Sequence, residues 1–192
     1  MRIAIVSLFC CFLLSCQSGT KENTTVGGKY LGSAEWTERH PEDARLDLPR
    51  RPELENKAVY SRSLPERYQE TIFYQGGVIR LDTLTNNAGF RRKLVNSKFR
   101  SLIESVSWSK ANLPGPIPDI SDSAISMDRS VQYATFSIKG HSCAAIYRGV
   151  GRRVQQYYES SIFGVACGER NTPLDTYRND VISYVQRIDV SR

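Results

Sequence analysis

Histidine is scarce in this sequence, and the scarcity limits the catalytic chemistry open to the chain. Among 192 residues only His40 and His141 are histidines. Ser142 follows His141 directly, but adjacent residues on a strand point to opposite faces and do not form a nucleophile–base pair unaided. The sequence also lacks the glycine-rich signatures of serine hydrolases and of nucleotide-binding loops. We therefore expect a protein that is not an enzyme and that carries no cofactor and no metal ion.

Long apolar runs are lacking as well. The most apolar segment, Ile3–Leu14, has about twelve residues, whereas a helix that crosses a bilayer core needs about twenty. Arg2 precedes this segment, and a positive start followed by a short apolar run is the layout of a secretory signal. A short buried helix is the alternative, but the polar residues that follow offer it nothing to pack on. We expect residues 1–15 to be a signal peptide.

The end of that segment, Leu13-Leu14-Ser15-Cys16, resembles the lipobox of bacterial lipoproteins. The resemblance covers only residues 1–17. It implies cleavage before Cys16, whose thiol and new amino group would carry acyl chains such as palmitate. Several acyl chains hold a protein on a membrane stably, because a single chain binds only marginally. Gln17, in place of an Asp, implies the outer membrane. The resemblance thus implies a lipid-anchored protein of the cell envelope that faces the periplasm.

Cysteine is also sparse beyond the signal segment. Once Cys16 is set aside, Cys143 and Cys167 remain. Two cysteines in an exported domain indicate one disulfide, although two buried thiols or a metal pair are alternatives. The two cysteines stand similarly far from the middle of the segment that joins two β-rich runs. An antiparallel hairpin would therefore bring them within the separation that a disulfide needs.

Residues 16–65 show no apolar periodicity and predict a long disordered tether. Charges of both signs are interleaved there with glycines and prolines. Such a segment cannot bury enough apolar surface to offset the entropy lost on ordering. We therefore expect one folded domain, residues 66–192, that hangs from the membrane by this tether.

Hairpins and helices are predicted within the folded part. One hairpin is centred on Gly76-Gly77, and another joins runs at 133–147 and 161–167 through a connection at 149–158. Apolar residues recur at three to five positions over 88–107, which predicts a helix. A second helix is predicted to begin after Thr172 as its N-cap, with Pro173 in the first helical position. These elements predict a small α+β domain, an antiparallel sheet packed by two helices and joined by one disulfide.

The connection between the two long strands holds the clearest candidate for a binding surface. Arg148, Arg152 and Arg153 are close in sequence to Tyr157 and Tyr158. Arginine with tyrosine is typical of interaction hot spots and also suits sugars and anionic polymers. The plainer alternative is an exposed loop whose tyrosines pack on the edge of the sheet.

Three functional hypotheses follow. The main one is a non-enzymatic binding or assembly component, held on the membrane through Cys16, whose partner is another envelope protein. The first alternative is a module that binds the glycan of the cell wall, peptidoglycan. The second is a cryptic envelope hydrolase using carboxylates such as Glu104, Glu159 or Glu169. The net charge of +6 is too small an excess to point to nucleic acid, and export makes nucleic acid an unsuitable partner.

Overall fold

The structure is a computed structural model that describes residues 25–26, 29–30, 35–84, 89–155 and 157–191. The predicted signal peptide and the predicted lipidation site Cys16 lie outside the described residues. The chain divides into two compact units, residues 1–33 and 34–192. In the first unit β1 (Thr25–Val26) pairs antiparallel with β2 (Lys29–Tyr30).

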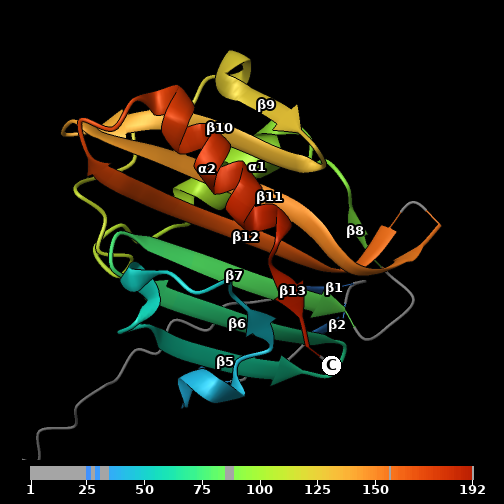
Figure 1. The fold of residues 1–192 in the computed structure, drawn as a ribbon. Helices are drawn as coiled ribbons and strands as arrows, with labels where there is room; N and C mark the ends of the chain where they lie inside the picture. Colours follow the sequence, from blue (N-terminus) through green and yellow to red (C-terminus); the bar gives the residue numbers. More distant parts are fainter. Residues whose placement is uncertain (1–24, 27–28, 31–34, 85–88, 156, 192) are drawn as a thin grey trace, which may run out of the picture. The chain divides into compact units, whose positions relative to one another are not determined.

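An antiparallel sheet of nine strands forms the body of the second unit (Figure 1). Its strands follow the order β3-β5-β6-β7-β12-β11-β10-β9, and β8 also pairs with β12. Their bounds are β3 Thr37–Arg39, β5 Ala58–Leu64, β6 Arg67–Tyr74, β7 Gly77–Leu84, β8 Phe90–Arg91, β9 Ile125–Asp128, β10 Val131–Ile138, β11 His141–Val154 and β12 Tyr157–Arg170. The predicted antiparallel sheet is confirmed, but the fold is so rich in sheet that the term α+β fits it only in part.

The β6–β7 hairpin forms where the sequence predicted one. Tyr74 and Gly77 face each other across a two-residue turn in which Gly76 has a φ of +79°, a conformation that glycine adopts without strain. The ring of Tyr74 lies over Gly77, where a Cβ atom would come within 2.4 Å of the ring. The backbone conformation of the turn thus favours glycine at Gly76, and the position of the Tyr74 ring favours glycine at Gly77.

The hairpin of β11 and β12 is longer than predicted. Residues 149–158 were expected to be a connection, but both strands continue through it to pair Arg153 with Tyr158 and Val154 with Tyr157. A register shift between Val150 and Arg153 lets the pairing resume beyond an irregular stretch. The expectation of a loop was wrong because ladder hydrogen bonds continue to satisfy the backbone there.

One helix packs on each face of the sheet. The C-terminal helix α2 (Leu174–Gln186) begins one residue later than predicted, because Pro173 is extended and takes the N-cap position. Figure 1 shows α2 crossing β10, β11 and β12, and short strands β4 (Leu46–Asp47) and β13 (Asp189–Val190) pair beside it. The side chains that α2 buries are Tyr177, Val181, Ile182, Tyr184 and Val185.

The helix α1 (Asn96–Glu104) packs on the opposite face through Phe99 and Ile103. The sequence predicted a helix over 88–107. The helix ends three residues earlier than predicted, and the prediction was also wrong for residues 89–95. There the backbone finds partners outside the helix, because β8 pairs with β12 and the side-chain amide of Gln132 binds both backbone groups of Leu94. Those bonds replace the ones that a helix would have made.

The folded unit begins well before residue 66, which corrects the predicted boundary of the tether. Strands β3 and β5 and the buried residues Leu46, Leu48, Leu54 and Val59 all fall within the predicted tether. We call residues 44–54 the strap. Its leucines belong to the same apolar cluster as α2, so the burial missing from the local sequence pattern comes from distant residues.

A buried carboxylate holds the strap on the sheet. Glu70 is 0% exposed, and it accepts hydrogen bonds from the backbone N–H groups of Arg45 and Leu46 at 2.9 and 3.0 Å. The hydroxyl of Tyr68 donates to the same carboxylate at 2.8 Å, and the Arg45 guanidinium lies 4.1 Å from the centre of the Tyr68 ring. Three donors and a nearby cation offset the cost of burying this charge.

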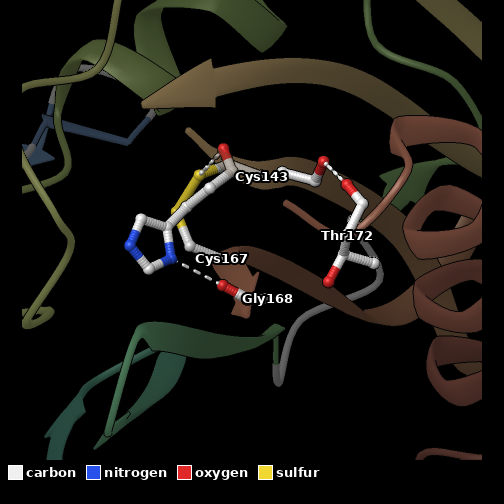
Figure 2. The surroundings of a disulfide bond; sticks show 6 residues. Cys143, Cys167, Gly168 and Thr172 are labelled. Carbon is white, nitrogen blue, oxygen red and sulfur yellow. Dashed lines mark hydrogen bonds between the residues drawn. A yellow bond between two sulfur atoms is a disulfide. The ribbon is translucent and has the colours of Figure 1, made fainter. Parts of the chain in front are cut away.

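The predicted disulfide between Cys143 and Cys167 is confirmed. The two residues face each other in the β11–β12 register (Figure 2). Beside them the Nδ1–H of His141 donates to the Gly168 carbonyl at 2.9 Å, and Ser142 donates to the Thr172 carbonyl at 2.6 Å. The disulfide thus lies where two hydrogen bonds fix the start of β11 against the chain that leads into α2.

Replacing both cysteines, Cys143→Ala with Cys167→Ala, is expected to lower the free energy of unfolding by about 3 kcal/mol, because the bond closes a loop of 24 residues in the unfolded chain. Chemical denaturation measures the change. The parent protein under reducing conditions is the control and should unfold near the midpoint of the double variant. Equal midpoints for the oxidised parent and the double variant would contradict the expectation.

Glu70→Gln is expected to lower the free energy of unfolding by about 2 kcal/mol, because an amide nitrogen cannot accept the hydrogen bond that one carboxylate oxygen receives. Hydrogen exchange at Arg45 and Leu46 should also accelerate. Glu55→Gln, which alters an exposed carboxylate, is the matched control and should change neither quantity. Unaltered exchange at the strap in Glu70→Gln would show that this carboxylate does not hold it.

Candidate functional site

The structure separates Arg148 from the other members of the predicted binding surface. Its guanidinium lies under the end of α2 and donates to the carbonyls of Val185 and Ile188 at 2.6 and 3.4 Å. Burial lowers the pKa of Arg148. The side chain therefore binds the carbonyl end of the helix, where a cation is favourable.

The other four predicted residues lie together at the far end of the β11–β12 hairpin. Arg152, Arg153 and Tyr157 are exposed, whereas Tyr158 is half-buried with its ring over Gly149. Tyr158 thus packs on the strand, as the plainer reading of this segment expected. Arg152 and Arg153 thus remain at the surface.

A second feature, which the sequence did not single out, is a groove of about 950 Å³ between the face of β5, β6 and β7 and the segment that follows α1. We call it the Trp36 groove. Its lining includes the aromatic residues Trp36, Tyr60, Phe73 and Phe163 and the cations Arg80 and Lys110.

Strand alternation builds the floor of the Trp36 groove. Tyr60, Phe73 and Arg80 lie on one face of β5, β6 and β7, while Val59 and Ile72 belong to the cluster beneath the strap on the other face. The Tyr60 and Phe73 rings meet edge to face, with centroids 6.0 Å apart. This contact fixes both rings side by side on the floor of the groove.

Trp36 lies at one edge of the groove, under two arginines. The Arg62 guanidinium is 4.6 Å from the centre of the indole and the Arg80 guanidinium is 6.0 Å from it, within cation–π range. Arg80 also donates to the Thr71 hydroxyl at 3.3 Å. Trp36 is still 36% exposed, so the groove offers an aromatic surface that is held in place but open to solvent.

The opposite wall of the groove comes from the segment after α1. Ala111 and Leu113 are buried and fix this segment on the core, which leaves Lys110 exposed at the rim. The charged residues of the lining are two cations, Arg80 and Lys110. The exposed indole of Trp36 and the half-buried rings of Tyr60 and Phe73 lie between cations and amide or hydroxyl groups. This combination suits a ligand that has flat or apolar faces and accepts hydrogen bonds.

A second cavity, of about 930 Å³, opens on the other face between the strap and α2. Arg51 crosses its mouth, where it binds Asp180 at 2.9 Å and Glu53 at 3.5 Å and lies 4.1 Å from the centre of the Tyr184 ring. Burial raises the pKa of the Tyr184 hydroxyl to about 12, and it also raises the pKa of the Tyr74 hydroxyl in the cavity wall. The carboxylate of Asp180 thus joins α2 to Arg51 of the strap.

The described structure does not join His141 and Ser142 into a nucleophile–base pair. His141 and Ser142 donate to different backbone carbonyls, and neither hydrogen bond joins one side chain to the other. Among the described residues, no group of three or more His, Cys, Asp or Glu side chains is placed to hold a metal ion.

The sequence contained only a weak signal for the Trp36 groove. Trp36 falls in a segment without apolar periodicity, and the alternation that puts Tyr60 and Phe73 on one face spans two strands whose pairing is not visible locally. The groove therefore became apparent only from the tertiary structure. In comparisons with known proteins, no family model, no curated protein and no solved structure matches this chain.

Proposed function

We propose that this chain is a non-enzymatic binding component of the cell envelope, held on a membrane through lipid on Cys16, that takes its partner in the Trp36 groove. The observation that carries the binding role is the exposed indole of Trp36, which two arginines hold beside the Tyr60–Phe73 pair. Ordering an aromatic side chain in advance lowers the entropy that binding costs.

The anchor rests on the sequence around Cys16. The apolar segment before it is short, and no helix among the described residues is long and apolar enough to cross a membrane. Lipid at Cys16 provides a membrane attachment that needs no such helix.

The groove also favours a second candidate, binding of cell-wall glycan. Sugar rings present flat apolar faces that pack on an indole, and their hydroxyls pair with amide and hydroxyl groups. Asn56, Ser105 and Asn112 supply such groups in the lining of the groove. A hydrolase would draw its support from two converging carboxylates, whereas the charged groups of this lining are Arg80 and Lys110.

Trp36→Ala is expected to abolish capture of the partner by a photo-crosslinking residue placed at Lys110, because the adduct forms only while the groove is occupied. The measurement is made in intact cells on the full chain, and mass spectrometry identifies the adduct. A protein adduct supports the assembly role, and a glycan adduct supports the second candidate.

The matched control for that experiment is Trp108→Ala, which removes an indole that is 45% exposed and does not line the groove. Its adduct yield should equal that of the parent. Equal yields from Trp36→Ala and the parent would remove the groove from the proposal. Thermal unfolding of both variants checks that the fold is retained.

Cys16→Ala is expected to release the protein from the membrane fraction and to remove incorporated lipid label, because the thiol that would carry the acyl chains is gone. Fractionation with a labelled fatty acid measures both. Membrane association that persists without any lipid label, in the parent as well as the variant, would refute the anchor and leave the groove to be judged alone.

A further inference from the structure

We infer that a second surface docks the folded unit onto a bilayer that carries anionic phospholipid headgroups. We call it the distal basic surface, and its residues are Arg91, Arg92, Lys93, Arg152 and Arg153. The inference rests on the proposed membrane anchoring, which keeps a bilayer within reach. Docking would add an orientation to that anchoring, because it turns one defined end of the sheet toward the lipid.

Three strands bring these cations together from distant parts of the sequence. Arg91 on β8 pairs with Tyr157 on β12, and Tyr158 pairs with Arg153 on β11. Strands β8 and β11 therefore flank β12, each about 4.8 Å from it. Figure 1 shows β8 beside the far end of the β11–β12 hairpin.

The β8 segment is fixed in place before any ligand arrives. Gly89 lets it approach β12, because a Cβ atom there would lie 2.5 Å from the Cβ of Tyr157. The hydroxyl of Tyr147 donates to the Arg91 carbonyl at 2.8 Å and ties the backbone of β8 to β11. The amide of Gln132, which is 0% exposed, binds both backbone groups of Leu94.

Charge and side-chain type favour a lipid surface as the occupant. All five cations are exposed. The hairpin carries one carboxylate nearby, Glu159, which accepts a hydrogen bond from the Arg152 backbone N–H at 3.0 Å. Tyr157 is 38% exposed among these cations, and tyrosine beside arginine is typical of residues at the headgroup level of a bilayer. Each cation near such a surface raises affinity about five-fold.

Binding of the full chain to vesicles tests the inference. The vesicles contain phosphatidylglycerol in phosphatidylcholine, and pure phosphatidylcholine vesicles serve as reference. Arg152→Gln with Arg153→Gln is expected to lower the partition coefficient for the anionic vesicles about 25-fold at low salt. Arg92→Gln with Lys93→Gln should lower it similarly. The difference should vanish at about 1 M salt, where the Debye length is about 3 Å.

Lys139→Gln with Arg170→Gln is the matched control, because it removes two exposed cations from the opposite end of β11 and β12. The control should leave the partition coefficient near the parent value. Residues 1–16 are the same in all these proteins, so differences in partition coefficient between them measure the distal basic surface whether or not Cys16 carries lipid. Failure of the anchor is detected separately, by the absence of lipid label.

Three results would overturn the inference. The first is an equal loss of vesicle binding in the control and in the two distal variants, which would show that binding depends on net charge and not on this surface. The second is unchanged vesicle binding in both distal variants while thermal unfolding shows them folded. The third is selective loss of binding to a soluble acidic polysaccharide with vesicle binding intact, which would assign the surface to a glycan.

Discussion

The carboxylate of Glu70 joins the two ends of the folded unit. It accepts the backbone N–H groups of Arg45 and Leu46, and the strand formed by Leu46 then pairs with β13, which follows the C-terminal helix. The carbonyl of Arg45 also accepts the Ser191 N–H at 2.8 Å. One buried charge thereby fixes the strap between the sheet and the last residues of the described chain. Removing such an acceptor leaves buried donors unpaired, which costs more than the bond itself contributes.

This arrangement determines which part of each sheet face is available for binding. The strap and α2 cover one face, and their shared cavity is bridged by Arg51, which binds carboxylates on both sides. On the other face α1 packs through Phe99 in a cluster that includes residues of β10, β11 and β12. The Trp36 groove occupies the neighbouring part of that face, over β5, β6 and β7. The groove is therefore bounded by the segment that follows α1 and not by α1 itself.

The two candidate surfaces differ in the chemistry they present. The Trp36 groove offers ordered aromatic rings with a few cations, which favours shape-dependent contact with a specific partner. The distal basic surface offers point charges on a rigid three-strand edge, which favours an extended anionic surface of no fixed shape. In the proposed membrane-held state the two surfaces are compatible, because the proposed docking of the second surface would leave the first free to select the partner.

The sequence by itself determined the local elements of this protein. It predicted the hairpin at Gly76 and the start of the C-terminal helix within one residue, because turn chemistry and capping act over a few residues. It also predicted the pairing of Cys143 with Cys167, because the two cysteines stand similarly far from the middle of one hairpin. Tertiary structure decided the start of the fold, the contact of Trp36 with its arginines and the site of Arg148 under α2. Those features depend on partners far away in the chain, and no local pattern records which distant residue will supply a hydrogen bond or an apolar face.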